Sequence, residues 1–192
     1  MVENVQIVQT EILCNNWYTL KKVTYEFNRP DGSKHTHSRE VYDRGNGATI
    51  LLYNKEAKTV ILTRQFRLPS FLNGNEDGML IEACAGLLEK DHPEACIKKE
   101  TEEETGYQVK DVRRIFEAYM SPGSVTEILY FFVAEYSKSI KVTDGGGLEE
   151  EQENIEVLEM TLDKAFEMIT TGGIKDGKTI MLLQYAKLNQ LV

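Results

Sequence analysis

One stretch in the middle of the chain, residues 85–106, constrains the fold more than any other segment. After a glycine turn it continues as a helix from Pro93 and stops at Gly106. Proline suits the first helical position, where its missing N–H needs no partner, and glycine closes a helix in the left-handed conformation. Asp91 or His92 can cap the helix start. The sequence therefore predicts a rigid unit of loop, helix and loop.

The predicted helix carries carboxylates on the side that should be apolar. With about 100° between successive residues, five side chains share that side: Cys96, Ile97, Glu100, Glu103 and Glu104. Carboxylates that face a core cost on the order of several kcal/mol unless they are paired or bind a cation. A solvated acidic helix is the alternative, since runs of charge usually lie on surfaces. A hard divalent metal ion, which takes oxygen ligands, would remove the conflict.

The same stretch resembles the Nudix box, the pattern G-x5-E-x7-R-E-U-x-E-E-x-G-U in which U is apolar. The matching residues are Gly86, Glu100, Glu103, Glu104, Gly106 and Tyr107. The interval between the first two of these is one residue short of the pattern. Three further positions differ from the Glu, the Arg and the apolar residue of the pattern, and they hold His92, Lys99 and Thr101. These departures affect the loop and the support of Glu103, and they leave both Glu100 and Glu104 in place.

The resemblance implies Mg²⁺ or Mn²⁺ as the cofactor. In this family the ions are held by a backbone carbonyl, here that of Ala85, and by the carboxylates that correspond to Glu100 and Glu104. Paired divalent ions can polarise a phosphorus centre and lower the pKa of a bound water. The remaining box carboxylate, Glu103, is expected to act in positioning through Lys99 or a ligand water.

A further carboxylate is expected from the acidic loop that precedes the last strand. The family uses a loop acid as general base or third metal ligand, and counting back from the strand start at Ile155 assigns this role to Glu153. Counting forward from Gly147 assigns it to Glu151 instead. We prefer Glu153 because a strand is a firmer anchor than a glycine-rich loop. The glycines at 145–147 would provide the hinge of a closing lid.

Nearly the whole chain resembles the nucleoside-diphosphate-sugar pyrophosphatases of the Nudix superfamily, and most closely the GDP-mannose hydrolase subfamily. The segments that carry this resemblance are residues 39–45, 64–67, 121–123, 145–147 and 174–179. It implies hydrolysis of GDP-mannose to GMP and mannose 1-phosphate. ADP-ribose or ADP-sugar hydrolysis is the alternative within the class. A catalytically silent nucleotide-sugar sensor of the same fold is the alternative from another class, motivated by the altered box.

The resemblance also implies a set of contacts with the small-molecule nucleotide sugar. These residues are Trp17, Ser38, Arg39, Glu40, Arg67, Ala85, Gly86, Leu87, Glu127 and Lys178. Arg64 and Arg67 follow a core strand, and their guanidinium groups can hold a diphosphate; an ordinary surface arginine pair is the alternative. Trp17 is suited to stacking on a base, with a core or hairpin aromatic as an equally weighted alternative.

Composition narrows the partners of the chain. Its 192 residues carry a formal net charge of −9, and no basic stripe offers a footprint for nucleic acid. Cys14, Cys84 and Cys96 are odd in number and widely spaced, which is typical of reduced thiols. The chain has neither a basic leader followed by an apolar run nor 18 consecutive apolar residues. We therefore expect a cytoplasmic protein without nucleic-acid or membrane partners.

The order of predicted elements indicates an α/β fold. Hairpin-like strands flanked by helices predict an α/β/α sandwich with a mixed sheet, which is also what the Nudix resemblance implies. We place an N-terminal antiparallel β layer at residues 1–43 and the Nudix hydrolase domain at 44–192. The β layer has too little chain to bury both of its faces, so we expect a homodimer in which it packs on a partner and completes the substrate pocket.

Overall fold

The computed structural model describes residues 2–88, 90–148, 150 and 153–192. Internal contacts divide the chain into two units. The N-terminal unit is the chain up to Asn46 together with Tyr119–Ile128, and the main unit is Gly47–Ala118 with Leu129–Val192. Among the described residues, no helix is long and apolar enough to cross a membrane.

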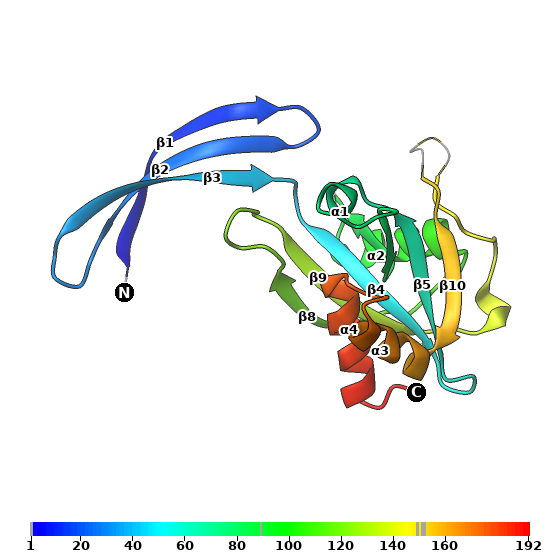
Figure 1. Ribbon diagram of the computed structural model, residues 1–192. Helices are drawn as coiled ribbons and strands as arrows, with labels where there is room; N and C mark the ends of the chain where they lie inside the picture. The colour runs from blue at the N-terminus through cyan, green and yellow to red at the C-terminus, as the bar shows by residue number, and fades with distance from the viewer. Residues whose placement is uncertain (1, 89, 149, 151–152) are drawn as a thin grey trace. The chain divides into compact units, whose positions relative to one another are not determined.

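The N-terminal unit is built on a three-stranded antiparallel sheet in the order β1-β2-β3 (Figure 1). Its strands are β1 (Glu3–Asn15), β2 (Thr19–Asn28) and β3 (Lys34–Asp43). The expected antiparallel layer is confirmed. The turn between β2 and β3 contains Gly32, which has a φ of +81°.

The main unit contains a seven-stranded mixed sheet in the order β10-β5-β4-β9-β8, with β6 paired to β5 and β7 to β4. Strands β4 and β9 pair in parallel, whereas β4 pairs antiparallel with β5 and β7, and β5 pairs antiparallel with β6 and β10. The strands are β4 (Gly47–Asn54), β5 (Thr59–Phe66), β6 (Met79–Glu82), β7 (Ala85–Leu87), β8 (Arg113–Tyr119), β9 (Ile128–Glu135) and β10 (Glu156–Thr161). The helices are α1 (Leu68–Leu72), α2 (Pro93–Thr105), α3 (Leu162–Thr171) and α4 (Gly177–Leu188), with a 3₁₀ turn at Lys138–Ile140.

Both faces of this sheet are covered. Alternate residues of β4 point to opposite faces, and Ala48, Ile50 and Leu52 pack in one core cluster with Ile97 of α2. The intervening Leu51 is also fully buried. Helices α3 and α4 contact each other and lie on the face opposite α2 (Figure 1). The predicted α/β/α arrangement with a mixed sheet is confirmed.

The box helix has the caps that its sequence predicts. Helix α2 begins at Pro93, the His92 side chain accepts a hydrogen bond from Glu94 N, and Gly106 ends the helix at a φ of +78°. A second glycine segment then packs against this end. Gly146 N donates to the carbonyl of Glu104 at 2.9 Å, so a loop from far along the chain satisfies a helix-end acceptor.

We predict that the close packing at Gly106 makes it far less replaceable than a glycine of the same conformation elsewhere. A Cβ at Gly106 would lie 2.2 Å from the Thr143 carbonyl oxygen, whereas one at Gly172, the α3 cap with a φ of +77°, would meet nothing nearer than 3.6 Å. Gly172→Ala should cost about 1 kcal/mol of unfolding free energy, from the left-handed backbone alone. Gly106→Ala should cost at least about 2 kcal/mol more in urea denaturation, and equal losses would contradict this packing.

Candidate active site

Two buried carboxylates lie at the edge of the main sheet, and the first belongs to α2. Ile97 anchors the helix in the core, and Glu104, two turns later, is only 3% exposed. Among the described residues, its Oε2 atom has no hydrogen-bond partner. Burial raises the pKa of Glu104 to about 8; the thiol of Cys84 donates to this carboxylate and lowers the pKa, while Glu100 raises it. Burial and the neighbouring acids thus disfavour the ionised form of this carboxylate.

Glu100 lies one turn before Glu104, directly against the backbone of β7. A Cβ on Gly86 would stand 2.1 Å from Glu100 Cδ, so only glycine leaves room for this side chain. The neighbouring Ala85 and Leu87 pair with β4 in an antiparallel ladder. Sheet pairing and a missing side chain thus bring the predicted carbonyl segment and the Glu100 carboxylate together.

Among the described residues of the acidic loop, Glu153 is an acid whose charge affects α2. It contributes to the raised pKa of Glu104. Its Oε2 accepts a hydrogen bond from Leu148 N at 3.2 Å. It also touches Gly147, where a Cβ would lie 2.4 Å from Oε2. The competing residue of our sequence interpretation, Glu151, lies outside the described residues.

The glycines 145–147 have a packing role in the structure, where the sequence suggested a hinge. All three have positive φ angles. A Cβ on Gly145 would lie 2.5 Å from the Glu104 carbonyl oxygen. Gly147 N donates to the Glu103 carbonyl at 3.1 Å. The loop therefore docks on the C-terminal end of α2, and this contact delivers Glu153 to the box.

The donor set fits a hard divalent cation. Glu100, Glu104 and Glu153 supply carboxylate oxygens, and the orphaned Oε2 of Glu104 has the burial and charge that a metal ion would satisfy. As they stand, no three His, Cys, Asp or Glu side chains of the described chain are gathered closely enough to form a complete metal centre. Glu103 pairs with Lys99 at 3.4 Å, which agrees with the positioning role expected for it.

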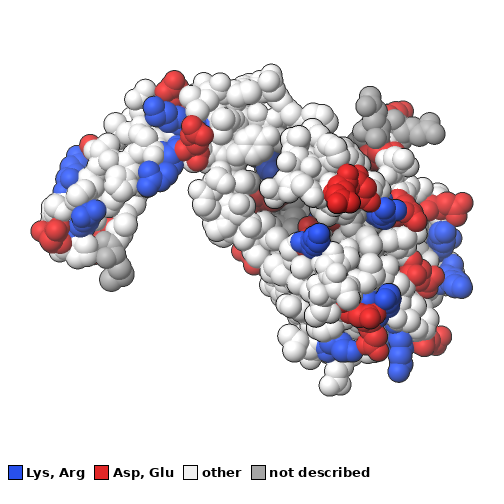
Figure 2. All heavy atoms as spheres, in the orientation of Figure 1, with Lys and Arg blue, Asp and Glu red and all other residues white. Residues whose placement is uncertain are grey.

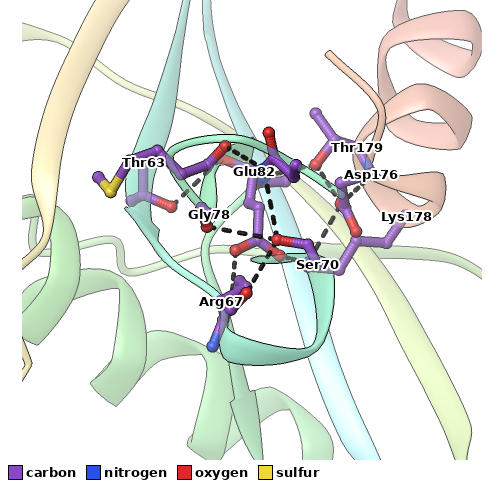
Figure 3. Close-up of polar contacts among 11 residues, drawn as sticks. Thr63, Arg67, Ser70, Gly78, Glu82, Asp176, Lys178 and Thr179 are labelled. Atoms are coloured by element: carbon purple, nitrogen blue, oxygen red, sulfur yellow. Dashed lines mark hydrogen bonds and ion pairs between the residues drawn. The ribbon is translucent and has the colours of Figure 1, made fainter. Parts of the chain in front are cut away.

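The second buried carboxylate, Glu82 at the end of β6, is held by two cations. It is also 3% exposed. Figure 3 shows it between Arg67, whose Nε donates to Glu82 Oε2 at 2.6 Å, and Lys178, whose Nζ bonds Oε1. Lys178 pairs with Asp176 as well, at 3.1 Å. Glu82 was not among the residues that we predicted from the sequence. A lone acid in an otherwise apolar strand beside the box does, however, indicate a buried carboxylate that needs partners.

The two arginines of β5 and its end have different surroundings. Arg67 lies near enough to Glu104 to lower its pKa. Arg64 pairs instead with Asp77 at 3.3 Å and Glu156 at 3.4 Å. It lines a separate pocket of about 280 Å³ together with Lys175. Arg64 thus has the contacts of the surface arginine that we weighed as the alternative.

Other predicted substrate contacts belong to the N-terminal unit. Arg39 and Glu40 line a pocket of about 450 Å³ with the loop 122–126. In the same unit, Glu127 stands 3.7 Å from Arg44. Trp17 is 87% exposed, which excludes the core alternative for this residue. Ser38 is exposed, and its hydroxyl bonds that of Thr24 at 2.8 Å.

The charged residues of the main unit are mixed in sign. On the face shown in Figure 2, acidic and basic side chains alternate over this unit without a continuous basic stripe. This agrees with the charge pattern that the sequence indicates.

Comparisons with known proteins agree over the full length of the chain. Residues 4–42 match the model of the GDP-mannose pyrophosphatase NudK N-terminal domain, and residues 43–183 match the NUDIX domain. A GDP-mannose pyrophosphatase of Escherichia coli O1:K1 / APEC is 56% identical over 192 residues, which is 100% of both chains. One of Klebsiella pneumoniae subsp. pneumoniae is 54% identical over 98% of this chain and 94% of its own.

A solved structure supports the fold independently. The crystal structure of an ADP compounds hydrolase superposes with a TM-score of 0.74 at 16% identity, over 100% of this chain and 99% of the other. At that identity the likeness concerns the fold alone. Because a family model covers most of the chain and full-length relatives share more than half of its residues, the chain belongs to the Nudix hydrolase family, in the GDP-mannose pyrophosphatase subfamily.

Proposed function

We propose that this Nudix hydrolase splits the pyrophosphate bond of GDP-mannose, giving GMP and mannose 1-phosphate. The observation that carries the proposal is the buried Glu104, whose Oε2 has no partner in the described structure and whose pKa is raised beside Glu100 and Glu153. Such a set of acids suits a cation that binds together with a diphosphate. The choice of sugar nucleotide is supported by the full-length relatives named GDP-mannose pyrophosphatase.

The residues divide the chemistry between them. The Ala85 carbonyl, Glu100 and Glu104 would hold Mg²⁺ or Mn²⁺. A bound divalent ion supplies charge neutralisation and a water of lowered pKa. Glu153 accepts a proton from the attacking water. The water oxygen bonds to phosphorus as the P–O bond of the anhydride breaks. The guanidinium of Arg67 stabilises the charge of the diphosphate.

The remaining assignments belong to the same proposal. Trp17, Ser38, Arg39, Glu40 and Glu127 contact the nucleotide sugar, as do Gly86 and Leu87 of the main unit. We also infer a domain boundary near Asp43, supported by the change of contact unit after Asn46. The three free cysteines support a cytoplasmic location.

Two other functions remain as alternatives. Hydrolysis of ADP-ribose or an ADP-sugar is the alternative within the same reaction class. A silent nucleotide-sugar sensor is favoured by Lys99 and Thr101 in the box. The sensor fits less well, because a binding module has no need of a buried acid with an unsatisfied oxygen, which costs stability.

A panel of GDP-mannose, ADP-ribose and ADP-glucose, assayed for phosphate after phosphatase treatment of the products, tests the function. GDP-mannose should be the preferred substrate, a chelator should abolish turnover, and added Mg²⁺ should restore it.

Glu104→Gln should lower kcat at least ~10³-fold, on the order of 4 kcal/mol in the barrier, because it removes the charge that holds the cation. Glu102→Gln is the matched control on the same helix. The Glu102 side chain accepts a hydrogen bond from Gln108 at the surface, and its replacement should leave the rate unchanged. Absence of turnover with every compound would favour the sensor.

The two acids of the loop should differ sharply in their effect. Glu153→Gln should lower kcat by roughly 10²- to 10⁴-fold and leave substrate Kd nearly unchanged, since a general base acts in the transition state. Glu151→Gln should change little and serves as the control for the acidity of the loop. The opposite order of the two variants, in single-turnover kinetics, would move the base to Glu151.

We expect a homodimer formed through the N-terminal unit. Five apolar side chains of the edge strand β1 are exposed: Val5, Ile7, Val8, Ile12 and Leu13. A long exposed apolar edge strand is suited to pairing with another chain. Light scattering should give twice the chain mass at micromolar concentration, and Ile12→Lys should shift it to the monomer, while Gln9→Lys on the same strand should not. A fully active wild-type monomer would refute the dimer.

A further inference from the structure

Glu82 and Glu104 are the only carboxylates among the buried polar side chains of the described residues. They differ in whether their oxygens have partners. Glu104 keeps an oxygen without a partner. Glu82 has both oxygens occupied, one by Arg67 and one by Lys178. Together with Asp176, the cluster contains two acids and two bases, so its charge is balanced inside the protein. Glu82 therefore has no need of a metal ion, and its role follows from the side chains that it binds.

What Glu82 holds is one side of a guanidinium group. Among the described residues, Arg67 makes its side-chain hydrogen bond through Nε, and neither terminal nitrogen has a hydrogen-bond partner. The side chain is 40% exposed, so these nitrogens are accessible to a ligand. Two parallel N–H groups on one edge match the oxygens of a phosphate or diphosphate. The charge of Arg67 also lowers the pKa of Glu104, so this arginine belongs to the surroundings of the proposed metal site.

The backbone on both sides of the contact is fixed as well. Arg67 N donates to the Gly78 carbonyl at 2.8 Å, and Ser70 Oγ donates to the Arg67 carbonyl at 2.9 Å (Figure 3). On the other side, Thr63 Oγ1 donates to the Glu82 carbonyl at 3.2 Å. A side chain with many rotamers is thus restricted from its main chain to Nε. A binding group ordered in advance loses less conformational entropy when its ligand arrives.

Lys178 has a different character from Arg67. Its side chain is only 13% exposed, and its ammonium contacts both Glu82 and Asp176. Asp176 in turn caps α4 through Thr179 N and Oγ1. Lys178 therefore acts on the Glu82 side of the cluster, where it offsets the second oxygen and ties α4 to β6.

We propose that Glu82 is a positioning residue that, supported by Lys178, holds Arg67 through Nε so that its two terminal nitrogens face the diphosphate before the substrate binds. The inference rests on the proposed function in that a diphosphate is the ligand. It assigns Lys178 to this support, with its effect on the substrate passing through Glu82 and Arg67.

A double-mutant cycle on the full chain tests this, with calorimetric titration of imidodiphosphate in constant Mg²⁺ as the probe. Arg67→Ala and Glu82→Gln should each weaken binding at least ~10-fold, and the double variant should bind no worse than the weaker single variant. KM for GDP-mannose should rise with the same pattern, while the Mg²⁺ concentration for half-maximal rate stays unchanged. Glu156→Gln is the matched control, because it removes an acid that pairs with a different arginine, Arg64 of β5, and it should bind as the wild type does.

The outcomes separate the possible errors. Additive losses in the double variant, or wild-type affinity in folded Glu82→Gln, would overturn the positioning role, and so would failure of the wild type to bind imidodiphosphate. If thermal unfolding shows that Glu82→Gln is not folded, Arg67→Lys replaces it as the test. The single ammonium of this lysine would be occupied by Glu82, so the affinity for imidodiphosphate should fall as far as in Arg67→Ala. Retained affinity would refute the inference. Binding of imidodiphosphate without hydrolysis of any nucleotide sugar would refute the proposed function and leave the cycle readable.

Discussion

The burial of Glu104 is the constraint on which the rest of the main unit depends. Ile97 is packed in the core, and a rigid helix therefore carries Glu104 inward two turns later, where one of its oxygens has no partner among the described residues. The raised pKa is the electrostatic expression of that placement. The surrounding backbone is adapted to the same helix face, since Gly86 leaves room for Glu100 and Gly145 approaches the end of α2 more closely than any other residue could.

Under the proposed function, the two buried acids have complementary tasks, one toward a cation and one toward an anion. Around Glu104 the acids outnumber the bases, which favours a metal ion. Around Glu82 two acids and two bases balance, and the accessible edge of Arg67 carries positive charge outward. A metal-bound diphosphate has both kinds of charge, and the two clusters offer charges that are complementary to it. The contrast also shows that burial of a carboxylate does not by itself indicate a metal ligand.

Strand β1 of the N-terminal unit cannot be recognised from alternation of apolar and polar residues. Strand β1 forms from residues 3–15, yet apolar residues occupy both parities there, among them Ile7 and Val8. The register with β2 shifts between Ile7 and Gln9 and again between Ile12 and Cys14. Each irregularity exchanges the two faces of the strand, so the simple alternation that marks a strand with one buried face is absent.

The sequence by itself determined the local parts of this protein. Proline and glycine set the bounds of α2, and helical spacing placed its acids on the face of Ile97, because both depend only on neighbouring residues. Contacts between distant segments were decided by the tertiary structure. That Glu153 reaches Glu104 depends on the docking of the glycine loop on α2, and that Glu82 holds Lys178 depends on how α4 packs near β6, 96 residues apart in the chain. Local propensity cannot specify such pairs, because their distances arise only when the sheet and its two helical layers assemble.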